Sequence, residues 1–182
     1  MVEPNISPRT QIRTSNTLMK NDKIKECEAL LYLEADLLDS RKWTIWRDLY
    51  VEDCMIWVPA WDTEDDLVED PELSVNMIYL LGKPAIEARL HRIESDDAYA
   101  SLPLARTSHS VTNIRIVEDR GNEVDVSAKW TVLSLEPRRG KSWRGGWYDY
   151  TLRCANSGLM IKTKKITLLE NMIDGTVDIY QI

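Results

Sequence analysis

The period of the hydrophobic pattern changes from helical to extended within residues 20–60, and this change constrains the fold more than any other feature. In the first segment, apolar residues recur at steps of three and four: Ile24, Cys27, Leu31, Ala35 and Leu38. Asp39 and Ser40 break that pattern and can cap a new helix. The sequence therefore predicts helices at about 19–38 and 40–50. From residue 53 to 58 the period is two, which predicts a strand that Pro59 ends.

The rest of the chain predicts a small helix and a run of long strands. Pro84 suits the first turn of a helix that runs to about Ile93. Strands are predicted at 75–81, 105–118, 123–136, 146–155 and 159–170. Helices first and an antiparallel meander last indicate the α+β class, with the N-terminal helices packed on a strongly curved, mainly antiparallel sheet to form a cone. We expect a flexible arm over 1–17 and a single domain over 18–182.

Charge and composition argue against several classes of partner. The chain has 30 acids and 23 bases and a net charge of −7, which disfavours binding to nucleic acid or to an anionic membrane. It contains no apolar run near 18 residues and no signal-peptide core, so we expect no membrane span and a cytoplasmic protein. Cys27, Cys54 and Cys154 lie far apart, as reduced thiols of a cytoplasmic protein would.

The sequence offers no recognisable metal or cofactor site. It contains two histidines, His91 and His109, and no CxxC, CxH or CxxH pair, so ligands for an iron–sulfur cluster or a facial triad are not in evidence. The acidic run 62–66 lacks the glycine and the final acid of a calcium loop. Gly140-Lys141-Ser142 lacks the first glycine of a phosphate-binding loop. We therefore predict no metal-binding and no cofactor-binding residues on this chain.

Acid–base catalysis is harder to exclude, because a cone with a helical lid can enclose an apolar pocket. A buried carboxyl or imidazole in such a pocket can acquire a shifted pKa. The candidate residues are Asp36, Tyr50, Asp53, His91 and His109. The alternative is that the two aspartates lie at exposed positions and that His109 is a hydrogen-bonded strand residue. A small-ligand binding module with the same fold also stays open.

The segment 138–147 has the composition of a contact surface. It combines arginine, tryptophan and glycine in what we expect to be a hairpin connection. Arginine and tryptophan are enriched at interface centres because they combine a large contact area with directional donors. The residues predicted to form a subunit interface are Arg106, Arg138, Arg139, Trp143, Arg144 and Trp147.

Taken together, several motifs in their order and spacing resemble the small (β) subunits of aromatic-ring-hydroxylating dioxygenases, the Rieske non-haem iron oxygenases. The resemblance covers nearly everything after residue 20. Its motifs are the segment 34–39, Trp43-x-x-Trp46, the segments 57–62, 69–71 and 106–113, and the closing segment 177–182. The segment 57–62 and the acidic loop that follows it are most similar to the branch acting on benzoate, anthranilate and related aromatic carboxylates.

This resemblance implies an NTF2-like cone and a non-catalytic role in assembly. In such enzymes the β subunits associate with catalytic α subunits, commonly as an α3β3 hetero-hexamer with a β trimer. The α chain carries the Rieske [2Fe–2S] cluster and the mononuclear Fe(II), which use NADH-derived electrons to insert both atoms of O2 into an aromatic ring. The family's catalytic residues have no counterparts in this sequence. The alternative functions are a stand-alone isomerase, dehydratase or cyclase with a His–Asp pocket, or a module that binds a small aromatic ligand.

Overall fold

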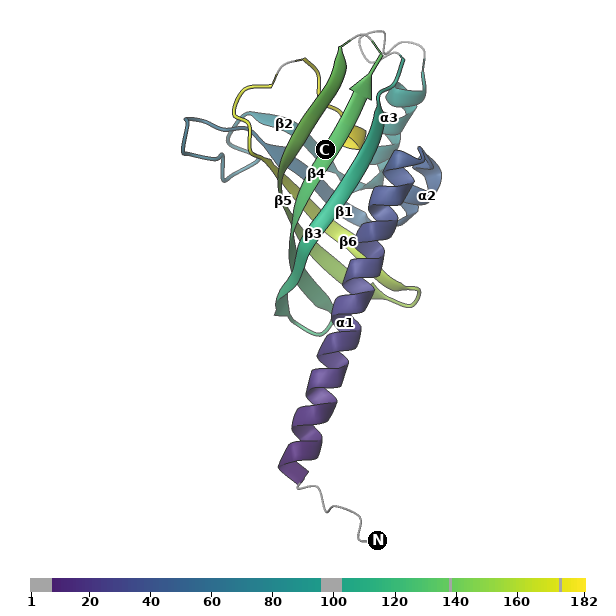
Figure 1. The fold of residues 1–182 in the computed structure, drawn as a ribbon, viewed down its shortest axis with the longest axis vertical. Helices are drawn as coiled ribbons and strands as arrows, with labels where there is room; N and C mark the ends of the chain where they lie inside the picture. Colours follow the sequence, from purple (N-terminus) through teal and green to yellow (C-terminus); the bar gives the residue numbers. More distant parts are fainter. Residues whose placement is uncertain (1–7, 96–102, 138, 174) are drawn as a thin grey trace.

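A six-stranded, strongly curved sheet forms the body of the protein, and its helices lie along one side (Figure 1). The computed structural model describes residues 8–95, 103–137, 139–173 and 175–182. The elements in chain order are α1 (Pro8–Asp39), α2 (Trp43–Asp48), β1 (Tyr50–Pro59), β2 (Asn76–Leu81), α3 (Gly82–Glu94), β3 (Arg106–Asp119), β4 (Glu123–Glu136), β5 (Gly140–Ala155), β6 (Gly158–Leu168) and a closing 3-10 helix (Ile179–Gln181).

The strand order is β2-β1-β6-β5-β4-β3. Strands β1 and β6 pair in parallel, and the other neighbours pair antiparallel. The parallel pair brings the first strand beside the last, so the sheet joins residues more than 100 positions apart in sequence. This is the α+β, NTF2-like cone that the sequence predicted, with the six strands and three helices close to their expected places.

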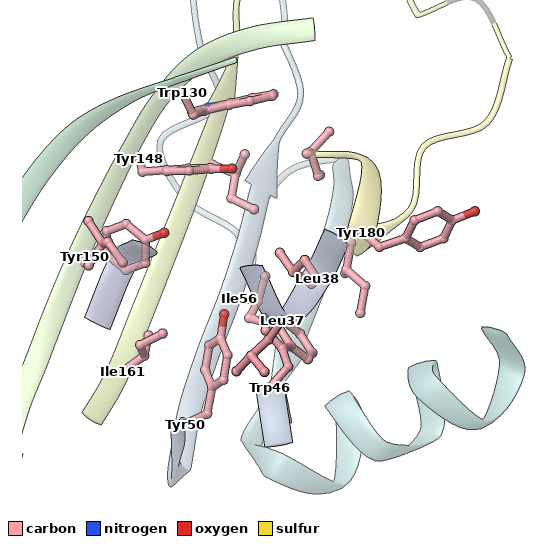
Figure 2. Close-up of a cluster of buried hydrophobic side chains, with 14 of the residues drawn as sticks. Leu37, Leu38, Trp46, Tyr50, Ile56, Trp130, Tyr148, Tyr150, Ile161 and Tyr180 are labelled. Atoms are coloured by element: carbon pink, nitrogen blue, oxygen red, sulfur yellow. The ribbon is translucent and has the colours of Figure 1, made fainter. Parts of the chain in front are cut away.

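The core lies between the concave face of the sheet and the helices. Helix α1 buries its apolar stripe, including Cys27, Leu31 and Leu38, against this face. Strand β4 contributes alternate residues from Val124 to Val132. Figure 2 shows the rings of Trp130 and Tyr148 stacked within this core, with centroids 5.2 Å apart. Burial of this apolar surface is the main force that closes the cone.

Two element boundaries differ from the predictions. Helix α1 begins at Pro8, so the backbone of residues 8–17, which we expected to form a flexible arm, is helical. Proline suits this first position because its fixed φ is helical and no hydrogen bond from its nitrogen is needed there. The N-terminal part of α1 extends well beyond the sheet (Figure 1). Residues 1–7 lie outside the described chain, and the domain boundary at 17/18 stays a prediction.

The second difference concerns the basic connection. Strand β5 begins at Gly140 rather than near residue 146, so residues 140–145 pair with β4 in continuous register and only a short turn joins the two strands. Gly140 has a φ of +85°, a left-handed conformation that glycine adopts without a steric cost, and it closes this turn. The expected long hairpin loop is therefore mostly strand, which fixes on which face of the sheet each of its side chains lies.

Candidate functional site

A buried ion pair occupies the interior of the cone. Glu34 on α1 and Lys164 on β6 are almost completely buried, and the Lys164 Nζ lies 2.9 Å from the Glu34 Oε1. The Tyr50 hydroxyl donates to the same oxygen at 2.5 Å, and the Tyr150 hydroxyl donates to Oε2 at 2.7 Å. The Lys164 ammonium also lies 4.3 Å from the centroid of the Tyr148 ring.

The electrostatics of this cluster keep Glu34 ionised. Burial acts to raise the pKa of Glu34, but the charge of Lys164 and the donated hydrogen bonds outweigh it and leave the pKa below its ordinary value. Burial, with the charge of Glu34, raises the pKa of both Tyr50 and Tyr150 well above the ordinary range. Both carboxylate oxygens are occupied by donors, so the cluster ties helix to sheet and has no obvious free group for chemistry.

A second, partly buried pair joins the end of α1 to β3. The His109 Nδ1 lies 2.6 Å from the Asp39 Oδ1, and the His109 backbone N–H donates to Oδ2 at 2.8 Å. Thr107 donates from its hydroxyl to Oδ1 at 2.8 Å. Burial opposes ionisation of Asp39, but the bonds from His109 and Thr107 outweigh it and lower the pKa of the carboxyl. A carboxylate that orients an imidazole in this way is also used in acid–base catalysis.

Four buried polar atoms of the core have no hydrogen-bond partner among the described residues. They are the His109 Nε2, the Tyr148 hydroxyl oxygen and the indole nitrogens of Trp46 and Trp130. Burial, together with the charges of Glu34 and Asp39, raises the pKa of Tyr148 well above its ordinary value. Buried polar atoms of this kind are commonly satisfied by ordered water. The Asp39–His109 pair therefore has one ring nitrogen without a partner among the described residues, and this nitrogen is a candidate for acid–base chemistry.

The other predicted catalytic candidates do not join these clusters. Asp36 is exposed on α1, and His91 is exposed on α3. Asp53 forms a surface ion pair with Arg153, with oxygen-to-nitrogen distances of 2.7 and 2.9 Å. Tyr50 belongs to the Glu34 cluster. The structure thus brings His109 together with Asp39, which the sequence analysis had assigned only to helix capping.

Sequence reasoning missed Glu34 and Lys164. Glu34 lies three residues after Leu31 and four before Leu38, which places it on the buried face of the helix. This spacing could have predicted a buried acid. Lys164 was less visible. A register shift between β5 and β6 near Thr151 and Leu152 changes which residues of β6 face the core. The sequence pattern does not predict that shift.

Most of the predicted interface residues lie toward one end of β3, β4 and β5, whereas Trp147 lies in the middle of β5 opposite Lys129. Arg106 begins β3 opposite Leu135 and is exposed, as is Arg139 in the β4–β5 turn. Arg138 lies outside the described residues. Trp143 is 64% exposed and Trp147 is 39% exposed, and both lie on the convex face of β5. Arg144 has the opposite orientation and is only 8% exposed.

Trp143, Trp147 and Leu169 form an exposed apolar surface, which we call the tryptophan stripe. Gly145 separates the two tryptophans along β5, and the Leu169 backbone N–H donates to the Gly145 carbonyl at 2.9 Å. Leu169 is itself 62% exposed, so the three apolar side chains lie next to one another on the outside of the sheet. A contiguous exposed patch with two tryptophans is typical of a protein contact surface.

A pocket of about 300 Å³ lies beside this stripe, and we call it the Arg144 pocket. Residues that line it include Ser142, Trp143, Arg144, Glu170, Met172 and Ile173. Three buried polar atoms of these residues have no hydrogen-bond partner in the described chain: the Arg144 Nη1, the Ser142 Oγ and the Glu170 Oε2. An unmade hydrogen bond of a buried polar group costs about 1–3 kcal/mol, and more for a charge. The pocket is therefore suited to a group that brings hydrogen-bond acceptors to Arg144 and Ser142.

Metal ligands do not gather in the described part of the chain, where no three His, Cys, Asp or Glu side chains are placed to hold an ion. Among the same residues, no helix combines the length and apolar character that a membrane span requires.

The sequence of this chain matches one protein family over most of its length. The sequence model of a family described as "Ring hydroxylating beta subunit" matches residues 33–175. The small subunit of 2-halobenzoate 1,2-dioxygenase from Burkholderia cepacia is 32% identical over 154 residues, which cover 85% of this chain and 93% of that protein. The β subunit of benzoate 1,2-dioxygenase from Acinetobacter baylyi is 29% identical over 168 residues, with coverage of 92% and 99%.

A solved structure agrees with the sequence matches. The crystal structure of the β subunit of benzoate 1,2-dioxygenase from Burkholderia mallei aligns with a TM-score of 0.70 at 29% identity. The alignment covers 86% of this chain and 95% of that one. The matched range 33–175 includes Glu34, His109, the tryptophan stripe and the Arg144 pocket.

Proposed function

This chain belongs to the family of ring-hydroxylating dioxygenase β subunits, and on that premise we propose that it is the accessory subunit of a dioxygenase that oxidises an aromatic carboxylate. The observation that carries the proposal is the family match over residues 33–175, together with relatives that it matches over nearly their whole length. These relatives are subunits of enzymes named for benzoate and 2-halobenzoate, which share a ring that bears a carboxylate.

The partner in this proposal is a catalytic α subunit, assembled with the present chain as α3β3. The α subunit would hold the Rieske [2Fe–2S] cluster and the mononuclear Fe(II) and would receive electrons from NADH. The ligand chemistry of the present chain supports this division of labour, since its two histidines lie on different elements and no CxH or CxxH pair is present. We expect the assembly to be cytoplasmic.

The contact surface in this proposal is the end of the sheet where β4 and β5 meet. Arg106, Arg139, Trp143 and Arg144 lie there, and Arg138 is adjacent in sequence. Trp147 lies further along β5 on the same face as Trp143. In water, the two exposed tryptophans are unfavourable because they expose apolar surface. The buried Arg144 is unfavourable because its Nη1 has no hydrogen-bond acceptor. Burial against other subunits would offset both costs.

The test is reconstitution with the α subunit encoded beside this chain. We expect co-purification in a fixed ratio, iron in the α chain, and benzoate-dependent consumption of NADH and O2 when a reductase is supplied. Mass measurement by light scattering would give the stoichiometry. A chain that purifies alone, binds no α subunit and leaves ring hydroxylation unchanged when it is omitted would contradict the proposal.

One observation favours a second function, a stand-alone isomerase, dehydratase or cyclase. It is the Asp39–His109 pair, whose free Nε2 is buried in the core. Under this alternative, the isolated chain would convert a cyclic substrate without iron or NADH, and His109→Asn would reduce the rate by about a hundredfold or more. The dioxygenase proposal expects no such turnover.

A further inference from the structure

Two surface features of this chain carry opposite charge and are flanked by exposed apolar side chains. Among the ion pairs of the described residues, none includes Arg144 or an acid of residues 62–72. One feature is the Arg144 pocket. The other is the loop between β1 and β2, residues 60–75, which projects from the body of the protein (Figure 1). We propose that these two features bind each other between neighbouring copies of this chain, so that Glu72 of one copy enters the Arg144 pocket of the next. The inference rests on the proposed function, because it assigns a contact of the β trimer.

The polar groups of the Arg144 pocket need a hydrogen-bond acceptor from outside the chain. Arg144 is 8% exposed, and no ion pair in the described chain includes it. Its Nη1 has no hydrogen-bond partner, and neither has the Ser142 Oγ, two residues earlier on the same face of β5. Glu136 and Glu170 also line the pocket, yet neither lies within 4.0 Å of the guanidinium. A buried guanidinium without a partner is strongly unfavourable, which a carboxylate from another chain would correct.

The rim of the pocket indicates that the carboxylate belongs to a protein. Trp143 is 64% exposed and Met172 is 85% exposed, and both line the pocket. A free carboxylate small enough for about 300 Å³ would leave much of these side chains in water. A loop that carries an acid with apolar neighbours would instead cover the rim while its carboxylate reached Arg144.

The β1–β2 loop has this composition. Glu72 is exposed, and its neighbour Leu73 is 84% exposed, with Val75 at 78% two residues further on. Among the ion pairs of the described residues, none includes an acid of residues 62–72. The loop is held at its base, because the Trp61 Nε1 donates to the Leu168 carbonyl at 2.9 Å and Trp61 bridges to Leu67. A projecting segment with a fixed base can reach a neighbour without losing much conformational freedom.

Three-fold symmetry is consistent with a contact between the loop and the pocket. A ring of three copies needs a heterologous contact, in which two different surfaces of each copy meet. The projecting loop and the pocket are two such surfaces with complementary charge. Both surfaces are connected to the C-terminal end of β6. The Leu168 carbonyl there accepts the hydrogen bond from Trp61 that holds the base of the loop, and the chain then continues into Glu170 and Met172, which line the pocket.

Cross-linking tests the contact directly. Two chains are prepared in a Cys154→Ser background, one with Glu72→Cys and one with Ser142→Cys, and they are mixed under mild oxidation. We expect a disulfide-linked dimer only in the mixture, since Glu72 of one copy lies beside Ser142 of another. Cross-links at equal yield with Glu64→Cys, a control acid of the same loop, would contradict the assignment of Glu72.

Charge variants provide a second readout, and its first variant changes an exposed loop residue and leaves the pocket itself unaltered. Glu72→Arg, on an exposed loop, should weaken self-association by about 30-fold or more, because it places two cations together. Glu64→Arg makes the same change of charge and should leave the association within about threefold. Combining Glu72→Arg with Arg144→Glu should restore most of the association, as measured by light scattering over a dilution series.

The outcomes separate this inference from the proposed function. A trimer that persists unchanged in Glu72→Arg and Arg144→Met overturns the inference, while binding of the α subunit would still support the proposed function. Benzoate that binds the wild-type chain, but not Arg144→Met, while the trimer survives would show that the pocket takes a free carboxylate and would also overturn it. A chain that neither self-associates nor binds an α subunit would overturn both.

Discussion

Glu34 and Lys164 form an ion pair 2.9 Å long in the centre of the cone, although they are 130 positions apart in the sequence. One comes from the first helix and the other from the last strand. Tyr50 and Tyr150 bind the same carboxylate from β1 and β5, so a single side chain connects four elements of the fold. Such a pair specifies how the helix sits on the sheet, whereas apolar contacts alone would tolerate small shifts.

Removing one member of this pair should destabilise the protein strongly. Lys164→Met leaves the Glu34 carboxylate buried without its counter-charge, and we expect a loss of about 3–5 kcal/mol in the free energy of unfolding. The double variant Glu34→Gln/Lys164→Met should recover more than half of that loss, because no uncompensated charge remains. Urea denaturation measures both. Lys83→Met, which breaks an exposed pair with Glu52, is the control and should change stability by less than about 1 kcal/mol.

The protein should lose stability in acid, and Glu34 should be a main cause. Its folded-state pKa lies below the ordinary value of 4.5, so the unfolded chain binds the proton more readily than the folded one. The stability due to this carboxylate is therefore complete above about pH 4.5 and falls as the pH drops through the folded-state pKa. Asp39 acts in the same direction below its ordinary value of 3.8. In Glu34→Gln, the decline of the denaturation midpoint between pH 5 and 3 should be shallower, and an equal slope would contradict this account.

Gly146 should not tolerate a side chain. A Cβ at this position would lie 1.9 Å from the Thr167 carbonyl oxygen, which is backbone and cannot move aside. We expect Gly146→Ala to cost at least about 3 kcal/mol in unfolding free energy or to prevent folding, since overpacking beyond a few tenths of an ångström displaces the strand. Gly145→Ala is the matched control. Its Cβ would lie 3.1 Å from the Trp130 carbonyl oxygen, and the cost should be clearly smaller.

The Asp39–His109 pair should contribute to stability and not to dioxygenase turnover. Asp39→Ala removes the acceptor of three partly buried hydrogen bonds from Thr107 and His109 and should cost about 2–4 kcal/mol. The turnover per iron of the assembled dioxygenase should stay within about twofold. A loss of turnover without a loss of stability would instead assign the pair a chemical role.

Trp143 of the tryptophan stripe and its neighbour Arg144 should both contribute to assembly. Replacing Trp143 and Arg144 together by alanine should weaken subunit association by about tenfold or more, because interface tryptophan and arginine contribute more than other residue types. Light scattering across a dilution series measures the shift. Val117→Ser, at an equally exposed apolar residue on β3, is the control for general effects on solubility. An unchanged assembly mass would remove both residues from the interface.

Where the sequence predictions were accurate, the signal was local. The alternation from Val124 to Val132 indicated a half-buried strand, and β4 buries those residues. The step of three and four from Cys27 to Leu38 likewise indicated the buried face of α1. The interface candidates were assigned from composition alone, and their grouping at the end of β4 and β5 depends on a register that composition does not encode.

Where the predictions failed, the deciding interactions were distant in sequence. The segment 140–145 has glycine and basic residues typical of a loop, yet pairing with β4 makes it a strand, because extending an existing ladder satisfies its backbone hydrogen bonds. The pairing of Asp39 with His109 could not be predicted for a similar reason. It depends on where the end of a helix meets a strand about 70 residues later.

The sequence by itself determined the class of fold, the extent of the core and the lack of recognisable iron ligands, because periodicity and residue type are properties of neighbouring positions. Only the tertiary structure decided that Arg144 is buried while Trp143 is exposed at the rim of the same pocket, and that Glu34 contacts Lys164. Strand register and helix placement set these relationships. A shift of one residue in either would exchange buried and exposed side chains and leave the same sequence with a different surface.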